Sequence, residues 1–396
     1  MSVTFPKGFR AAGMTAGFKP SGRADLGLLV ADGDAVGAAG VFTTNAFAAA
    51  PVRLCRERLG DGRARAVVVN SGQANAGTGP DGDDDAFVTS AAVARVLRVP
   101  PEEVLPCSTG VIGARIPVLK FTGALPKLVG ALSAAGGNAF AESIMTTDTV
   151  TKMAYSESGG FRLGGCAKGV GMIRPDLATM LTFVTTDAPV SSAHLRTLTT
   201  SVLEPVFESL TVDACSSTND TVLLLASGAA GGDPVRPDTP EWRGLAGALG
   251  EVGDSLLSQL AADAEGVNHV LEVSVRGAAT DEDARVVARA IAESVLVKTA
   301  AFGGDPNPGR FLQAIGSSGV AFKPEEVQAR LGDVVVIKNG AIPTDFETEA
   351  ADAARAVVKA PEIPISVELG RGSGSARMLG CDLSYEYVRI NAEYTT

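Results

Sequence analysis

The stretch KGVGMIRPDLATMLTFVTTDA, residues 168–188, places a threonine hydroxyl between turn-forming residues and an apparent strand. Gly169, Gly171 and Pro175 favour a turn, and TMLTFVTT (179–186) has the β-branched composition of a strand. In such a setting the Thr179 hydroxyl can attack the carbonyl of Ala178 and form an ester. Water then cleaves the ester and leaves Thr179 with a free α-amine. This chemistry needs a turn-held peptide and an oxyanion stabiliser.

A freed α-amine at Thr179 would supply the base that the rest of the sequence lacks. Its pKa is about 7.7–8.0, so it can take the proton of its own hydroxyl near neutral pH. The only histidines, His194 and His269, are isolated and lack the spacing of a metal site or a catalytic triad. An Ala-Thr pair before a strand is nevertheless common, so a loop that leads into a core strand remains the alternative.

A second segment, PCSTGVIG at residues 106–113, predicts the oxyanion stabiliser. We expect a tight turn at Thr109 and Gly110, in which the glycine N–H approaches a ligand closely and the threonine hydroxyl is a second donor. Taken alone, the segment is equally typical of an ordinary Ser/Thr-Gly turn.

The composition excludes several other classes of protein. A net charge of −11 argues against nucleic-acid binding. No apolar run reaches 18 residues and the N-terminus lacks an apolar signal core, so we expect a cytoplasmic protein that does not enter a membrane. The five cysteines form no CxxC pair and are interpreted as small buried apolar side chains in a reducing compartment. GPDGDDD (79–85) lacks the EF-hand spacing and predicts the acidic start of a helix, so we expect no metal.

The elements that must position Thr179 follow from hydrophobic spacing. Strands are expected at 64–72, 220–228, 333–340 and 362–370, and helices at 85–98, 194–210, 241–262, 281–302 and 347–359. Asp281 is the expected N-cap of the fourth helix. The final segment, residues 376–394, predicts one or two long strands. Strands and helices do not alternate strictly, so the prediction is an α+β fold of mixed or antiparallel sheets covered by helices.

Taken together, these segments resemble the ornithine acetyltransferase family, also called glutamate N-acetyltransferase. The similarity covers nearly the whole chain, and the KGxGM…P…ATML block is its most specific part. The matching blocks are FTTNAFAAAPV (42–52), VVNSGQANAGTG (68–79), STGVIG (108–113), MTTDT (145–149), GGCAKGVGMIRPDLATMLTFVTTDA (164–188), SSTNDTV (216–222), DAEGVNHV (263–270), VKTAAFGGDPNPGR (297–310) and EYVRINAEYTT (386–396).

The resemblance implies a precursor that cleaves itself between Ala178 and Thr179. The α chain would be residues 1–178 and the β chain residues 179–396, and two of each would form a heterotetramer. The implied fold is an αββα-layered sandwich of mixed sheets and helices with an additional β-chain domain. The implied reaction moves an acetyl group from N²-acetylornithine to Thr179 and then to glutamate, in arginine biosynthesis. No cofactor is bound, although some members of the family also take acetyl-CoA as donor.

Residue by residue, the resemblance makes Thr179 the nucleophile and, through its amine, the base. Thr109 and Gly110 match the oxyanion-hole pair. One substrate contact falls on a threonine of the TTDT motif, for which we favour Thr147 over Thr146. The other contacts fall on Thr179 itself, Lys168, Glu265, Asn391 and Thr396. A lysine suits a substrate carboxylate, and a glutamate suits the side-chain ammonium of ornithine.

Several positions depart from the usual family pattern: Gln73, Gly77, Ala214, Cys215, Ser216, Ala264, Asn268 and Pro308. The nucleophile and the oxyanion pair are unchanged, so acyl transfer through Thr179 is the expected chemistry. The changes near Glu265 and in the DPNPGR segment (305–310) leave open which acyl donor and which amine acceptor the protein uses. Two alternatives follow. One is a paralogous acyltransferase or amidohydrolase of a secondary pathway, and the other is a non-catalytic relative.

Overall fold

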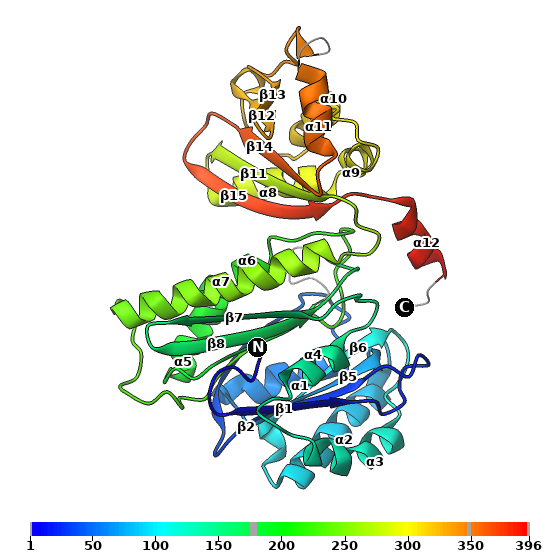
Figure 1. Ribbon diagram of the computed structural model, residues 1–396, viewed down its shortest axis with the longest axis vertical. Coiled ribbons are helices and arrows are strands. Elements are labelled where there is room, and N and C mark those ends of the chain that lie inside the picture. The colour runs from blue at the N-terminus through cyan, green and yellow to red at the C-terminus, as the bar shows by residue number, and fades with distance from the viewer. Residues whose placement is uncertain (1, 175–179, 347–349, 394–396) are drawn as a thin grey trace. The chain divides into compact units, whose positions relative to one another are not determined.

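The computed structural model describes residues 2–174, 180–346 and 350–393 (Figure 1). The chain forms two compact units, and each is described by itself. Unit 1 comprises Met1–Glu208 and Ser216–Leu260, and unit 2 comprises Ser209–Cys215 and Ala261–Thr395. The predicted cleavage pair, Ala178 and Thr179, and the predicted substrate contact Thr396 lie outside the described residues. The division into α and β chains at 178/179 therefore stays a prediction.

Unit 1 contains two mixed sheets. The first has the order β1-β2-β5-β6, with only β5 and β6 parallel. Its strands are Phe9–Met14, Leu26–Ala31, Ala66–Gln73 and Val104–Val111. The second has the order β4-β3-β10-β9-β8-β7, with only β9 and β10 parallel. In the same order, its strands are Arg63–Ala64, Val36–Phe42, Thr221–Ala226, Leu181–Thr186, Phe161–Lys168 and Lys152–Ser158.

The two sheets share one apolar core, and helices cover their other faces. Side chains from both sheets meet in one buried cluster, together with residues of α4 (Gly137–Ile144) and α1 (Ala50–Arg58). The opposite face of the first sheet is covered by α2 (Gly79–Leu97) and α3 (Val118–Gly130). Leu195 of α5 (Ser192–Leu198) and Leu256 of α7 (Pro240–Ala262) pack against the second sheet. Unit 1 therefore has the expected α+β architecture, with helical layers outside two sheets.

Strands β2, β9 and β10 are buried at every residue, which is why their sequences read as continuous apolar or threonine-rich runs. A strand that is covered on both faces has no side toward solvent, so its sequence need not alternate between polar and apolar residues. The threonines of β9 need partners in this setting, and Thr185 Oγ1 donates to the carbonyls of Val3 and Gly164. The strand that follows Thr179 is thus a buried, interior strand of its sheet in unit 1.

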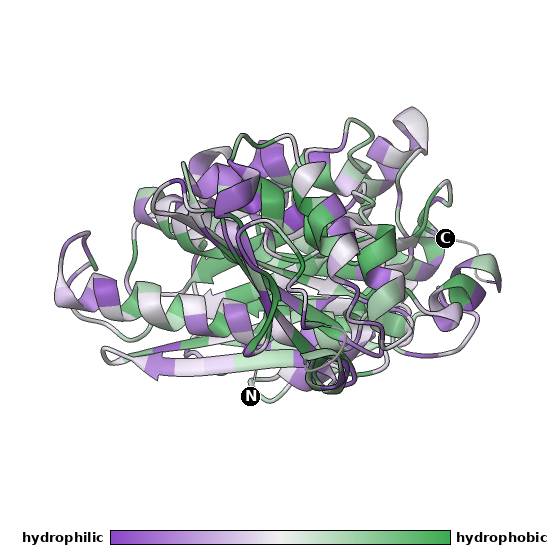
Figure 2. Cartoon of the chain, turned by 90° about the horizontal axis from the view of Figure 1, so that it is seen from above, coloured by the Kyte–Doolittle hydropathy of each residue, from purple (hydrophilic) through white to green (hydrophobic). Residues whose placement is uncertain are grey.

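Unit 2 is a five-stranded sheet with helices packed on one face. Its order is β13-β12-β14-β11-β15, with strands Val334–Ile337, Gln328–Leu331, Glu362–Glu368, Val270–Ala278 and Gly374–Cys381. The core lies between this sheet and α8 (Asp281–Glu293), α9 (Val295–Phe302), α10 (Pro308–Gly316) and α11 (Ala351–Val358). β14 alternates exposed and buried residues, as expected of a sheet with one covered face. Figure 2 shows polar and apolar residues on the same helices, the composition typical of helices with one face against a core.

The expected helices are present, with three differences. The helix predicted over 194–210 consists of α5, a π-helical stretch Thr199–Leu203 and α6 (Glu204–Phe207). The one predicted over 281–302 is broken at Ser294, whose side chain accepts the N–H of Val297 and starts α9. The predicted N-cap was wrong by one residue, because Thr280 rather than Asp281 accepts the N–H of Asp283.

The prediction of strands throughout residues 376–394 was wrong in its second half. β15 ends at Cys381, and α12 follows at Tyr385–Glu393. The β-forming residues Tyr385, Tyr387 and Val388 suggested a strand. The side chain of Ser384 decides for the helix, because its Oγ accepts the N–H of Tyr387 and satisfies a donor of the first turn.

Candidate active site

The residue after the predicted nucleophile is firmly held in unit 1. Met180 is buried, and its N–H donates to Asp220 Oδ1 at 3.0 Å. Its carbonyl accepts the N–H of Thr221, also at 3.0 Å. These contacts hold Met180, the residue that follows the predicted nucleophile in sequence, at the entry to β9.

Asp220 is an unusual anchor because its carboxyl group is fully buried. Burial raises its pKa well above the usual range, and the Met180 amide, Lys168 and Ser217 offset only part of that effect. Its Oδ2 has no hydrogen-bond partner of ordinary geometry among the described residues. Asp220 therefore holds the Met180 amide from a fully buried position.

The predicted oxyanion pair lies in β6, close to the end of that strand, and not in the tight turn that the sequence suggested. Gly110 has φ +125°, and a Cβ added there would lie 2.3 Å from the carbonyl carbon of Gly72 on β5. Only glycine permits this close approach of the two strands. The Thr109 side chain is buried, and within residues 2–174, 180–346 and 350–393 its hydroxyl has no hydrogen-bond partner. It is available as a donor.

The side chain of Asn219 connects β6, which contains the predicted oxyanion pair and is called the oxyanion strand below, to its surroundings. Asn219 Nδ2 donates to the carbonyl of Ser108 at 2.8 Å and to that of Ala74 at 2.7 Å. Ser108 Oγ in turn donates to Asn70 Oδ1 at 2.6 Å. The ends of β5 and β6 are thus cross-linked by buried side chains immediately before Thr109.

Lys168, at the end of β8, belongs to a second buried group in unit 1. Its Nζ donates to Thr146 Oγ1 at 3.2 Å. Asp148 Oδ1 accepts Lys152 Nζ at 2.7 Å and the N–H of Gly169 at 2.9 Å, and Oδ2 accepts the N–H of Thr146 at 2.9 Å. Burial would raise the pKa of Asp148, but the charges of Lys152 and Lys168 outweigh it and lower that pKa to about 2. Asp148 therefore joins the TTDT turn to the turn after Lys168.

Sequence reasoning missed a lysine in this group. Lys19 Nζ donates to the carbonyls of Ala24 at 2.7 Å and Met145 at 2.6 Å. Burial, together with the charges of Arg23 and Lys168, lowers its pKa to about 8. Lys19 stands in no motif, so only the fold reveals it. The favoured threonine, Thr147, is half-buried in the same turn as Thr146.

In unit 2 the structure brings two predicted substrate residues together. Asn391 Nδ2, on α12, donates to Glu265 Oε2 at 3.0 Å. One turn earlier on the same helix, Tyr387 OH donates to Asp213 Oδ2 at 3.1 Å. Tyr387 and Asp213 were missed by the sequence analysis. The spacing of Tyr387 and Asn391 is a helical signal that the expectation of a strand concealed.

The loop that carries Glu265 is pressed against the start of α12. Gly266 has φ +68°, and a Cβ there would lie 2.4 Å from the backbone nitrogen of Tyr387. Its carbonyl accepts Ser384 Oγ at 2.6 Å. A glycine at this position therefore sets the distance between Glu265 and Asn391.

Three departures from the family pattern have local structural roles. Gln73 Nε2 donates to the carbonyl of Phe18 at 3.2 Å, while its Oε1 is buried without a partner among the described residues. The N–H and the side-chain amide of Asn268 both donate to the carboxylate of Asp382. Pro308 is the first residue of α10, where a missing N–H costs no hydrogen bond.

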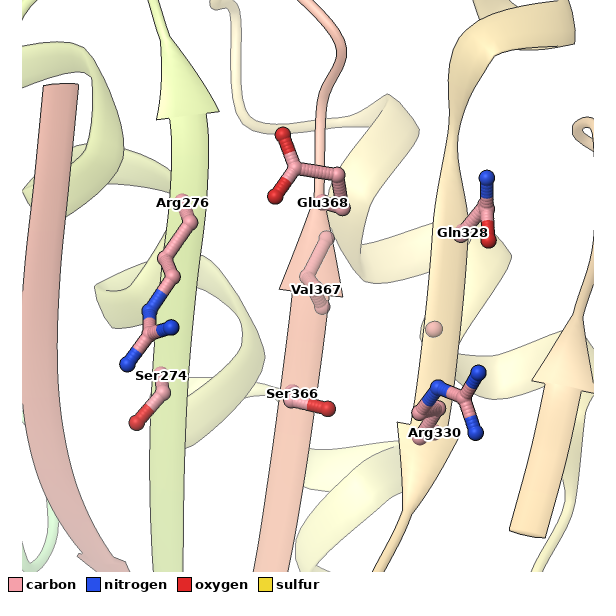
Figure 3. A pocket seen from close by; sticks show the side chains of 8 residues that line it. Ser274, Arg276, Gln328, Arg330, Ser366, Val367 and Glu368 are labelled. Carbon is pink, nitrogen blue, oxygen red and sulfur yellow. The ribbon is translucent and has the colours of Figure 1, made fainter. Parts of the chain in front are cut away.

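A hollow of about 380 Å³ on the uncovered face of the unit 2 sheet contains none of the predicted site residues (Figure 3). Its lining is Ser274, Arg276, Gln328, Ala329, Arg330, Ser366, Val367 and Glu368.

Within the described residues, no three His, Cys, Asp or Glu side chains are grouped to hold a metal ion. None of the helices in the described ranges is both long and apolar enough to span a membrane.

Comparison with known proteins identifies the family. The profile of the ArgJ family matches residues 10–396. The "Arginine biosynthesis bifunctional protein ArgJ 1" of Nostoc sp. is 45% identical and covers 100% of this chain and 98% of its own length. The corresponding protein of Thermobifida fusca is 41% identical and covers 100% of both chains. A crystal structure of the Bacillus halodurans protein is 40% identical, with a TM-score of 0.51, and covers 54% of this chain and 98% of its own. The resemblance to acetyltransferases is thus confirmed, and the chain belongs to the ArgJ family.

Proposed function

We propose that this protein is a self-cleaving acetyltransferase of arginine biosynthesis, which moves an acetyl group from N²-acetylornithine to glutamate through Thr179. The names of its relatives place them in arginine biosynthesis and call them bifunctional. One observation carries the mechanism. Asp220 binds Met180, which follows Thr179, and the adjacent Asn219 binds Ser108, which precedes Thr109.

The first step of the proposal is cleavage of the precursor. Thr179 Oγ attacks the carbonyl carbon of Ala178, and the nitrogen of Thr179 leaves as an amine that takes up the hydroxyl proton. The resulting ester joins Ala178 to Thr179 Oγ. Water hydrolyses this ester, which gives a carboxylate at Ala178 and a free hydroxyl and α-amine at Thr179.

Acetyl transfer then uses the same hydroxyl. The Thr179 amine takes the hydroxyl proton as Oγ attacks the acetyl carbonyl. The Thr109 hydroxyl and the Gly110 N–H donate to the oxyanion. Ornithine leaves with the proton. In the second half-reaction the amine of glutamate attacks the acetyl ester and gives up a proton to the Thr179 amine, which returns it to Thr179 Oγ as the acyl–oxygen bond breaks.

The substrate contacts are proposed separately for the two units. In unit 1, the Lys168 ammonium is suited to a substrate carboxylate, and Asp148 orients the turn that contains Thr147. In unit 2, Glu265, held by Asn391, offers a carboxylate for the ornithine side chain. Thr396 completes the proposed set. Acetyl-CoA is proposed as the second donor, in keeping with the relatives' description as bifunctional.

The proposed cleavage into residues 1–178 and 179–396 has independent support. The Bacillus halodurans chain matches over 98% of its own length and yet covers 54% of this chain, as a fragment of a divided enzyme would. A heterotetramer of two α and two β chains and a location in the cytoplasm remain part of the proposal.

The first test is the intact mass of the freshly purified protein under denaturing conditions. We expect two species, one ending at Ala178 and one beginning at Thr179, and acetyl transfer from N²-acetylornithine to glutamate. Thr179→Ala should give a single uncut, folded and inactive chain, while Thr179→Ser keeps a hydroxyl and should still cleave. Normal activity in Thr179→Ala would refute the mechanism.

The same measurements separate the alternatives. Cleavage without transfer from N²-acetylornithine to glutamate would refute the proposed reaction. Turnover of another acyl donor or amine acceptor would then identify a paralogue, and cleavage without any turnover a non-catalytic relative. A single full-length wild-type species without transfer would identify a non-catalytic relative.

A further inference from the structure

Two neighbouring residues of the SSTNDTV segment contact both parts of the proposed catalytic machinery. Asp220 accepts the N–H of Met180, which follows Thr179, and Asn219 donates to the carbonyl of Ser108, which precedes Thr109. We propose that Asn219 and Asp220 are positioning residues, which hold the nucleophile segment and the oxyanion strand at a fixed separation. This inference rests on the proposed function, because it assigns roles relative to Thr179 and Thr109.

The geometry of this link is rigid. Asn219 and Asp220 are adjacent, so the backbone between their side chains is one peptide unit. They lie immediately before β10, which pairs with β9 in parallel from Thr221↔Leu181 onward. The carbonyl of Asp220 also accepts the N–H of Thr43 at 3.0 Å, and Asn219 Oδ1 accepts Thr218 Oγ1 at 2.7 Å. The backbone of Asp220 and the side chain of Asn219 are thus each held by a further hydrogen bond, in addition to those with Met180 and Ser108.

The Asn219 contact connects the two sheets of unit 1. Ser108 lies on β6 of the first sheet, whereas Thr221 starts β10 of the second sheet and Met180 immediately precedes its neighbour β9. The Asn219 amide donates to Ser108 and Ala74, at the ends of β6 and β5. A change in this amide would therefore alter the spacing between the sheets at the reacting end, with little effect on either sheet alone.

The Asp220 contact depends on an acceptor oxygen and not on a negative charge. Its Oδ1 accepts one N–H, and its Oδ2 is buried without a partner of ordinary geometry among the described residues. A charged carboxylate is costly in such surroundings. An asparagine would keep the acceptor in nearly the same shape, so Asp220→Asn distinguishes a positioning role from acid–base chemistry by Asp220.

The test compares Asn219→Ala, Asp220→Ala and Asp220→Asn with wild type. Precursor cleavage is followed by intact mass over time, and kcat and KM for acetyl transfer are measured on the fully cleaved fraction. We expect both alanine variants to slow cleavage and to lower kcat by about 100-fold with KM little changed, because misplacement by about 1 Å costs that much. Asp220→Asn should recover most of the kcat lost in Asp220→Ala.

Thr185→Val is the matched control, because Thr185 is equally buried on β9 and donates to Val3 and Gly164, away from Met180. It should lower the melting temperature and leave kcat per folded enzyme unchanged. Alanine variants with unchanged kcat per folded enzyme would overturn the positioning role. Loss of activity in Asp220→Asn equal to that in Asp220→Ala would also overturn it, in favour of a chemical role for the acid.

The design separates this inference from the proposed function. If wild type neither cleaves nor transfers acetyl groups, the proposed function fails and the positioning role fails with it. If wild type cleaves and transfers and the alanine variants match it, only the positioning role fails. Should the alanine variants not fold, Asp220→Asn and Asn219→Asp decide. Asn219→Asp removes both donors and should lower kcat, while Asp220→Asn keeps the acceptor and should not.

Discussion

At the scale of single residues, buried charge is the dominant feature of unit 1. Asp148 is buried with Lys152 and near Lys168, and it binds the backbone of two turns at once. A buried ion pair adds little net stability compared with apolar residues, but removal of one partner leaves a buried charge uncompensated. The Asp148–Lys152 pair therefore serves mainly to fix the conformation of the turns around Lys168.

We predict that Asp148→Asn destabilises the protein by about 3–5 kcal/mol near neutral pH, because Lys152 loses its counter-charge. The folded pKa of Asp148, about 2, lies below its unfolded value of 3.8. The stabilisation is thus present above about pH 4 and is lost as the pH falls toward 2. The difference between wild type and variant should narrow by about 1 kcal/mol from pH 5 to pH 3.

Urea unfolding at a series of pH values measures this difference. Asp32→Asn is the control, because Asp32 pairs with Arg10 at the surface, where both side chains are about half exposed. It should change stability by less than about 1 kcal/mol at any of these pH values. A pH-independent effect of Asp148→Asn would contradict the assigned charge state.

At the scale of elements, α12 depends on a glycine in another segment. Gly266 lets the Glu265 loop lie against the first turn of α12, and Ser384 both caps that helix and binds the Gly266 carbonyl. Because α12 buries none of its described residues, these polar contacts carry much of its attachment to unit 2. These contacts of Gly266 and Ser384 also place Glu265 beside Asn391 on α12.

Gly266→Ala should therefore loosen α12. The positive φ and the 2.4 Å approach to Tyr387 N together predict a loss of about 1–3 kcal/mol. Hydrogen exchange should become faster across Tyr385–Glu393 than in wild type. Gly316→Ala is the control, because Gly316 has no strained φ and no atom within 4 Å of its added Cβ. Equal exchange in α12 for the two variants would show that Gly266 is not the attachment point.

At the scale of the whole molecule, the predicted cleavage falls in sequence between two strands that pair in one sheet. β8, which precedes Thr179, pairs with β9, which follows it, from Leu163↔Thr186 to Lys168↔Leu181. The core between the sheets of unit 1 also takes buried residues from both sides of the cleavage site. Neither part of the chain could bury its share of the core alone.

We therefore predict that the two fragments stay together after cleavage. In native gel filtration the fragments 1–178 and 179–396 should elute in one peak, at the volume of the uncut Thr179→Ala protein. They should separate only in denaturant, because separation exposes the β8–β9 edge and the shared core. Two peaks in native buffer would contradict this arrangement of the sheets.

The sequence by itself determined what depends on neighbouring residues. The Ala178–Thr179 pair and the Thr109–Gly110 pair are covalent neighbours, and strands such as Ala66–Gln73 and Thr221–Ala226 follow from local apolar runs. Only the tertiary structure decided that Lys19 approaches Lys168, that Tyr387 binds Asp213, and that Asn219 and Asp220 reach Ser108 and Met180. It also made Tyr385–Glu393 a helix, through a serine cap that competes with β propensity. These contacts join residues distant in sequence, and strand pairing and packing, which no local pattern encodes, set the distances between them.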